Sequence, residues 1–256
     1  MSAASRFVDR LPVNPPYDGV TAVAYDAWMP PDTRFPDDGI HADIVRRADG
    51  GSLELGVGTG RFLVPLVEQG YHLEGIDSSA DMLDRCRRHA AARHLDVMLH
   101  HGDIAPLTVP RRYGALVCPA GSFGLVVDKR RATAALASYL DHLQPGGTLA
   151  ISMTIPGPGD ITGFTWRLRR TATDDDATTY VVHEATGDDR EPQVMLVYNR
   201  LEVYDASGRL VSTQLRKHRL RWWTQDQFAA ALHATGFIDN RAIGTDTDWV
   251  TVTQRP

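Results

Sequence analysis

A glycine-rich turn that follows a short apolar strand constrains the fold of this chain more than any other sequence feature. Residues 53–62 read LELGVGTGRF, so Gly56, Gly58 and Gly60 come directly after the apolar segment. Glycine lets the backbone come within contact distance of a ligand. A dinucleotide-binding turn has the spacing G-x-G-x-x-G, whereas here it is G-x-G-x-G, and Glu54 stands two residues before the first glycine. A carboxylate at that place suits a cationic amine and would repel a pyrophosphate.

Strand and helix signals alternate on both sides of this turn. Apolar runs typical of buried strands occupy residues 52–57, 72–76, 97–100, 115–118 and 148–153. Helical signals occupy residues 40–47, 62–68, 80–94 and 131–143, and a Pro-Gly-Gly sequence at 145–147 stops the last of them. The hydroxyls of Ser78 and Ser79 can cap the helix at 80–94. Strands that alternate with helices predict an α/β fold with a doubly wound parallel sheet.

The pattern changes in the last third of the chain. The stretches TTYVVHEA, VMLVYNRLEVY and RLVSTQLRKHRLRWW alternate between polar and apolar residues, which predicts an antiparallel β insertion. The capping sequence TQDQ then starts a helix at 228–235, and strands at 237–243 and 249–253 bring the core sheet to seven strands. We expect four regions. An N-terminal arm or lid at 1–36 precedes an α/β core at 37–155. The β insertion at 156–223 is a substrate lid or a dimer face, and residues 224–256 complete the core sheet.

Two further acidic residues follow predicted strands at positions that suit a nucleoside. Asp77 closes the second strand, seventeen residues after Gly60, and an acid near that distance can accept both hydrogens of a ribose diol. Asp103 follows the third strand, where it can accept an exocyclic adenine amine while Ile104 packs on the ring. An ordinary turn aspartate explains Asp103 equally well. The two acids indicate an adenosine-containing ligand and do not separate a dinucleotide from other adenosine ligands.

Together these features resemble the class I S-adenosylmethionine-dependent methyltransferases. The resemblance covers roughly residues 25–147 and the C-terminal helix and strands, and LQPGGTL at 143–149 is similar to a family element that precedes the fifth strand. It implies a Rossmann-like sheet that binds S-adenosylmethionine and releases S-adenosylhomocysteine. It implies that Glu54 and the three glycines hold the methionine end, Asp77 the ribose, and Asp103 with Ile104 the adenine. The further cofactor-binding residues that it predicts are Tyr25, Ser78, Met82, Cys118 and Pro119.

The resemblance also implies a small-molecule acceptor. The loop at 118–123 lacks the Asn/Asp-Pro-Pro-Tyr/Phe signature of the nucleic-acid and protein amide N-methyltransferases. The chain is similar to small-molecule N- and O-methyltransferases in which an N-terminal tyrosine folds over the cofactor. This similarity implies that Tyr25 covers the cofactor and belongs to the catalytic site. Tyr17 is the second candidate for the same role. A hydroxyl acceptor needs a general base, and His218 and His183 in the insertion are the candidates, whereas an amine needs only to be neutral.

The insertion also carries arginines for which two interpretations stay open. Strand alternation gives three candidate faces, which are Arg216 with His218 and Leu220, Lys217 with Arg219 and Arg221, and Arg167 with Arg169. Guanidinium groups on such a face suit a carboxylate or phosphate on the acceptor. The alternative is a solvated sheet face whose positive charge is balanced by the acidic turns at 174–176 and 188–191.

Composition excludes several classes of partner. Lysine and arginine total 27 against 32 aspartates and glutamates, a formal net charge of −5, so no global positive field attracts nucleic acid or anionic lipid. No apolar run approaches the roughly 20 residues of a membrane span, and the N-terminus has no apolar signal core, so we expect a cytoplasmic protein. Cys86 and Cys118 are expected to be free thiols, and no cluster of residues has metal-ligand spacing.

We therefore predict a cytoplasmic methyltransferase, monomeric or homodimeric, that uses S-adenosylmethionine to methylate nitrogen or oxygen of a small metabolite in secondary metabolism. One alternative keeps the fold and the cofactor but transfers no methyl group, as in a cyclase or a ligand-sensing module that binds S-adenosylmethionine. The other alternative, an NAD-dependent dehydrogenase, is disfavoured by the glycine spacing.

Overall fold

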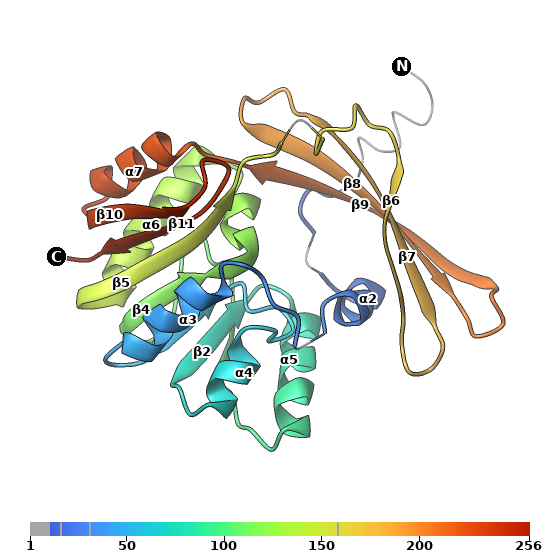
Figure 1. Ribbon diagram of the computed structural model, residues 1–256, viewed down its shortest axis with the longest axis horizontal. Helices are drawn as coiled ribbons and strands as arrows, with labels where there is room; N and C mark the ends of the chain where they lie inside the picture. Colours follow the sequence, from blue (N-terminus) through green and yellow to red (C-terminus); the bar gives the residue numbers. More distant parts are fainter. Residues whose placement is uncertain (1–10, 16, 31, 158) are drawn as a thin grey trace.

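The described part of the chain forms two β-sheets, which Figure 1 shows side by side. The computed structural model describes residues 11–256 except positions 16, 31 and 158, so the first ten residues of the predicted N-terminal arm lie outside the described residues. The core sheet has seven strands in the order β10-β11-β5-β4-β1-β2-β3. The insertion sheet has four strands in the order β6-β7-β8-β9.

The core sheet is the predicted doubly wound sheet. Its strands are β1 (Ser52–Leu55), β2 (Leu73–Asp77), β3 (Leu99–His101), β4 (Tyr113–Cys118), β5 (Leu143–Thr154), β10 (Ile238–Gly244) and β11 (Asp248–Gln254). Strands β3, β2, β1, β4 and β5 pair in parallel, and β11 pairs antiparallel with both β5 and β10. The chain runs from β1 to β2 and β3 on one side and returns to β4 on the other. The strand order therefore reverses at β1, and sheets of this kind bind ligands beyond the carboxyl ends of their strands at such a point.

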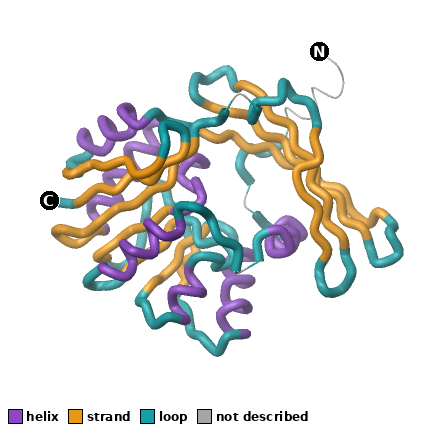
Figure 2. The backbone as a smooth tube through the Cα atoms, in the orientation of Figure 1, coloured by secondary structure: helices purple, strands orange, loops and turns teal. Residues whose placement is uncertain are grey.

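Helices cover both faces of the core sheet, as Figure 2 shows. One face is covered by α3 (Asp38–Arg47), α4 (Leu63–Glu68) and α5 (Ala80–Ala92), and the other by the 3₁₀ segment η1 (Pro119–Leu125), α6 (Lys129–His142) and α7 (Gln225–Ala234). Ser79 caps α5 by accepting a hydrogen bond from the amide of Met82, and Thr224 forms a capping box with Gln227 at the start of α7. No helix within the described residues is long and apolar enough to cross a membrane.

The insertion sheet is the predicted antiparallel β region, and a helix that we did not predict packs against it. Its strands are β6 (Arg167–Thr173), β7 (Thr179–Asp188), β8 (Val194–Tyr204) and β9 (Leu210–Arg221). Helix α2 (Val20–Trp28) lies between the two sheets (Figure 1), and its Ala24 is buried against Tyr180, Val182 and Leu201 of the insertion sheet. Nine residues without a side-chain cap make a marginal helix alone, so this tertiary contact is what stabilises α2.

One predicted boundary is wrong. We expected Pro145, Gly146 and Gly147 to separate a helix from a strand that begins at 148, but β5 already begins at Leu143. The amide of Gly146 donates to the carbonyl oxygen of Arg255 at 3.1 Å, and the amide of Arg255 donates to the carbonyl oxygen of Gly147 at 2.9 Å. A register shift between β4 and β5 in this region accommodates the proline, which cannot donate to the sheet.

The close approach of Gly114 to the loop before β1 yields a stability prediction. A Cβ atom on Gly114 would lie 1.8 Å from the carbonyl oxygen of Asp49, a backbone atom that cannot move without disturbing β1. We expect Gly114→Ala to lower the free energy of unfolding by about 1–3 kcal/mol or more, measured by urea denaturation. Gly39→Ala is the control, because nothing lies within 4 Å of its Cβ position in α3, and it should raise stability by about 0.5–1 kcal/mol. Equal stability of the two variants would contradict this packing.

Candidate functional site

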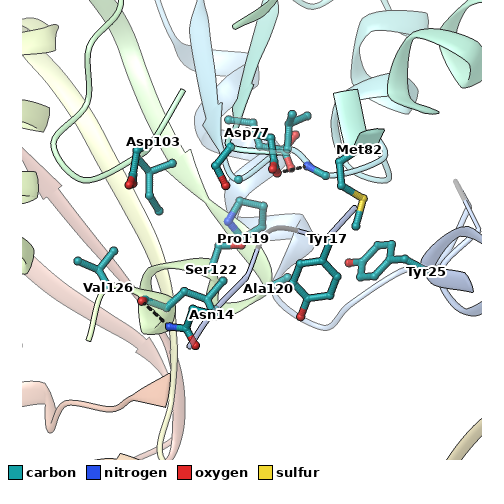
Figure 3. A pocket seen from close by; sticks show the side chains of 18 of the residues that line it. Asn14, Tyr17, Tyr25, Asp77, Met82, Asp103, Pro119, Ala120, Ser122 and Val126 are labelled. Atoms are coloured by element: carbon teal, nitrogen blue, oxygen red, sulfur yellow. Dashed lines mark hydrogen bonds between the residues drawn. The ribbon is translucent and has the colours of Figure 1, made fainter. Parts of the chain in front are cut away.

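A cavity of about 430 Å³ opens beyond the carboxyl ends of the core strands, and we call it the first cavity. Figure 3 shows side chains that line it, from Asn14, Tyr17 and Tyr25 near the N-terminus to Asp77, Asp103 and Pro119 beyond the strand ends. The cavity brings together most of the residues that the sequence singled out. They are Tyr25, Glu54, Gly56, Gly58, Asp77, Ser78, Met82, Asp103, Ile104, Pro119 and His218.

Glu54 supplies a buried carboxyl group to the first cavity. The residue is 3% exposed, and its Oε2 atom has no hydrogen-bond partner among the described residues. Burial raises the pKa of Glu54 well above its usual value, and the nearby Arg61 only partly opposes this shift. The Arg61 guanidinium is already engaged, because it donates to both carboxylate oxygens of Asp38 at 2.6 and 3.0 Å. A cation that enters the cavity therefore finds an uncompensated acid.

Asp77 fastens the end of β2 to the glycine turn. Its Oδ2 atom accepts from the amide of Gly58 at 2.9 Å, and its Oδ1 atom accepts from the amide of Ser79 at 2.9 Å. Burial raises the pKa of Asp77, and these backbone hydrogen bonds act in the opposite direction. Each oxygen retains a lone pair, so the carboxylate can also accept hydrogen bonds from a ligand.

The three glycines of the turn have different surroundings. A Cβ atom on Gly58, which lines the first cavity, would meet nothing within 4 Å. A Cβ atom on Gly60 would lie 2.5 Å from Sγ of Cys86, so Gly60 serves the packing of the turn against α5 and is outside the cavity lining. Cys118 is likewise fully buried outside the lining, and burial raises the pKa of its thiol to about 12.

Asp103 holds the turn that follows β3. Its Oδ1 atom accepts from the amide of Ala105 at 2.8 Å, and its Oδ2 atom accepts from Arg131 at 2.8 Å. Asp103, Ile104 and Arg131 all line the first cavity. The aspartate thus has the structural role that the sequence left open as an alternative, and it also faces the cavity.

Aromatic side chains form the opposite wall of the first cavity. The Tyr17 ring meets the Tyr25 ring edge-on at 5.9 Å and stacks on the His218 ring at 5.6 Å. Burial raises the pKa of Tyr25 to about 12, so its hydroxyl keeps its proton at neutral pH. The guanidinium of Arg216 lies over the Tyr17 ring, 4.7 Å from the ring centre.

The two candidate histidines lie on opposite faces of the insertion sheet. His218 pairs with Val197 and His183 pairs with Arg200, and these two partners stand three residues apart on β8. His218 is 4% exposed and lines the first cavity, whereas His183 does not. Burial, together with the charge of Arg216, lowers the pKa of His218 to about 4, so it is neutral at pH 7.

Asn14 is a lining residue that sequence reasoning missed. Its side chain donates to the carbonyl oxygens of Leu125 at 3.1 Å and Arg219 at 3.0 Å, and it accepts from the Arg219 amide at 2.6 Å. It thereby joins η1 and β9 at the cavity wall. These partners lie more than a hundred residues away in sequence, and no local pattern around Asn14 signals the contact.

A second cavity of about 450 Å³ adjoins the first and shares Ala120, Gly121 and Leu220 with it. We call it the second cavity. Its walls come from the end of β5, the loop that follows β5, and the insertion sheet. Its charged lining residues are Asp160, Arg167, Arg169, Glu184 and Arg221.

Comparison with known proteins agrees with this site. Residues 53–147 match a methyltransferase domain family. The chain is 30% identical over 191 residues to the dTDP-3-amino-3,6-dideoxy-alpha-D-glucopyranose N,N-dimethyltransferase of Streptomyces fradiae, a match that covers 72% of this chain and 68% of that enzyme.

Two solved structures share the fold along nearly the whole chain. DesVI of Streptomyces venezuelae superposes with a TM-score of 0.73 at 21% identity, covering 93% of this chain and 99% of that one. The S-adenosylmethionine-bound amino pentose methyltransferase CalS10 of Micromonospora echinaspora, involved in calicheamicin biosynthesis, superposes with a TM-score of 0.68 at 22% identity, covering 94% and 98%. With its glycine turn, its acids at the strand ends and these relatives, the chain belongs to the class I S-adenosylmethionine-dependent methyltransferases.

Proposed function

We propose that this enzyme methylates the amino group of an amino sugar carried on a nucleoside diphosphate. The relatives from Streptomyces fradiae and Streptomyces venezuelae are named as N,N-dimethyltransferases of dTDP-linked amino sugars, which supports this acceptor class. The observation that carries nitrogen over oxygen is His218, the one histidine that lines either cavity among the described residues. With a pKa of about 4 it is a poor base for a hydroxyl, whereas a neutral amine needs none.

The lining of the first cavity fits S-adenosylmethionine. The unpartnered Glu54 oxygen suits the methionine ammonium, the open space beside Gly58 suits close backbone contact, and Asp77 can accept from the ribose. Asp103 and Ile104 would hold the adenine, and Tyr25, Gly56, Ser78, Met82 and Pro119 complete the lining. When bound, the cofactor supplies an activated methyl group, so the protein has to align the acceptor and exclude water.

We assign the acceptor to the second cavity. It joins the first cavity at Ala120, Gly121 and Leu220, which makes this junction the place where the acceptor amine meets the methyl group. Tyr17 and His218 flank the first cavity near the junction and keep bulk water from it by their stacked rings. Gly121 has φ +72 and, with nothing within 4 Å of its Cβ position, leaves the junction open.

The acceptor class can be tested directly. We expect the purified enzyme, given S-adenosylmethionine, to methylate a dTDP-linked 3-amino sugar and to leave the matching 3-hydroxy sugar unmethylated, because His218 is a poor base for a hydroxyl. Mass spectrometry of the acceptor and measurement of S-adenosylhomocysteine are the readouts. Methylation of the hydroxy sugar at a comparable rate would contradict the preference for nitrogen, and methylation of neither sugar would refute the acceptor class.

The raised pKa of Glu54 predicts that cofactor binding releases a proton. Below that raised pKa the empty site holds neutral Glu54, and an incoming ammonium lowers the pKa, so the carboxyl group ionises on binding. Calorimetric titration with S-adenosylhomocysteine in buffers of different ionisation enthalpy should detect this proton, and affinity should rise as pH rises through the raised pKa. Glu54→Gln should abolish the proton release and weaken binding by about 1.5–3 kcal/mol.

Glu68→Gln is the matched control for this titration, because Glu68 is an exposed residue of α4 that pairs with Arg93 outside the cavity. It should leave affinity and proton release unchanged. Proton release that persists in the Glu54→Gln variant would assign the proton to another group.

The low pKa of His218 predicts that its imidazole is dispensable as a base. His218→Phe keeps an aromatic ring against Tyr17, so turnover of the amine acceptor should stay within about tenfold of wild type, whereas a true general base contributes about 10²–10⁴. The rate profile between about pH 6 and 8 should keep its shape, since His218 is neutral throughout. His183→Phe, on the other face of the sheet, is the control. A loss beyond a hundredfold in His218→Phe alone would restore His218 as the base.

A further inference from the structure

We propose that Arg167 and Arg169 form an anion subsite at the second cavity that binds the diphosphate of the acceptor. This inference rests on the proposed function, and it adds the part of the protein that recognises the charged carrier of the amino sugar. Both residues belong to β6 and line the second cavity.

Arg167 is a cation with no internal partner. Among the described residues its side chain makes no hydrogen bond, ion pair or ring contact, although Glu184 stands opposite it in the pairing of β6 with β7. Other arginines of the insertion sheet are engaged. Arg170 donates to the Trp28 carbonyl oxygen at 3.0 Å, and the buried Arg221 donates to Glu191 and to the Val127 carbonyl oxygen. All five guanidinium donors of Arg167 are thus available to a ligand.

Arg169 adds a second cation at the same cavity. The register of β6 shifts between Leu168 and Arg170, and both Arg167 and Arg169 line the cavity beside this irregularity. Arg169 pairs with Glu184 across 3.5 Å and is well exposed, which is a weak interaction that a phosphate can replace. Glu184 keeps a second partner, because Asn199 donates to it at 3.2 Å.

The charged residues that line the two cavities favour ligands of opposite charge. The first cavity holds the acids Glu54 and Asp77, and its arginines are engaged, Arg61 by Asp38 and Arg131 by Asp103. Both arginines that line the first cavity thus already have an acidic partner, so this cavity offers a diphosphate no free guanidinium among its described residues.

In the second cavity the balance is reversed. Glu184 pairs with Arg169 and accepts from Asn199, and Asp160 accepts from the amide of Gly157 at 2.7 Å. Neither carboxylate forms an ion pair with Arg167. Planar guanidinium groups bind phosphate oxygens through paired hydrogen bonds, so a diphosphate is the ligand chemistry that fits. With the diphosphate on these arginines, the sugar extends toward the junction at Ala120 and Gly121.

The subsite can be tested by binding, without turnover. The enzyme saturated with S-adenosylhomocysteine is titrated calorimetrically with dTDP and with thymidine, the uncharged nucleoside. We expect dTDP to bind and thymidine to bind at least about tenfold more weakly. Arg167→Gln should weaken dTDP binding by about tenfold to a hundredfold, and Arg167→Lys, which keeps the charge but loses the planar fork, should weaken it less. Arg169→Gln should weaken dTDP binding as well.

Arg209→Gln is the control for charge, because Arg209 is an exposed arginine between β8 and β9 that pairs with Asp205 and lines neither cavity. It should leave dTDP affinity unchanged. Equal dTDP affinity in wild type and Arg167→Gln, or equal binding of thymidine and dTDP, would overturn the subsite.

Activity separates a failure of the subsite from a failure of the proposed function. If the wild-type enzyme methylates the dTDP-linked amino sugar while Arg167→Gln keeps full dTDP affinity, the subsite is refuted and the function stands. If dTDP does not bind to the wild-type enzyme and only a phosphate-free amino compound is methylated, both the subsite and the nucleotide part of the proposed acceptor are refuted.

Discussion

The buried carboxyl group of Glu54 is the feature on which the electrostatics of this protein depends. It lies at the end of β1, where the strand order reverses, and its neighbour Arg61 is held by Asp38 in a buried two-point ion pair. Arg61 also donates to the carbonyl oxygen of Thr33, so the same guanidinium connects the glycine turn, α3 and the segment before α3. Because that cation is committed to structure, Glu54 has no full internal counter-charge, and the protein gains the capacity to bind a positively charged ligand there.

Contacts between distant parts of the chain complete this site. Helix α2 packs on the insertion sheet, Asn14 joins η1 to β9, and Tyr17 stacks on His218. The amide of Gly19 donates to the side chain of Asp81 in the first turn of α5. The N-terminal segment is thereby fixed to the insertion sheet and to the cofactor-side helix, which accounts for an aromatic wall built from residues that are far apart in sequence.

The two cavities differ in the charge of their linings. Acids gather at the carboxyl ends of parallel strands, where a cationic cofactor suits them, and arginines on β6 belong to a separate sheet that adjoins the same crevice. Of the arginines on the insertion sheet, Arg219 is balanced by Asp189 and Glu191, as a solvated face would be, while Arg167 is not. The interpretation as a balanced face therefore describes Arg219, while the interpretation as an anion site is our proposal for Arg167 and Arg169.

The sequence by itself determined the core sheet, the glycine turn and the acids at the strand ends, because these features are local: a strand, a turn and the next few residues fix where Glu54 and Asp77 lie. The tertiary structure alone decided the existence of α2, the strand start at Leu143, and which of His183 and His218 faces the cavity. It also decided that Gly60 packs against Cys86 of α5, whereas Gly58 stays open to the first cavity. These outcomes depend on partners distant in sequence, and a strand pattern gives two faces without saying which one another sheet will cover.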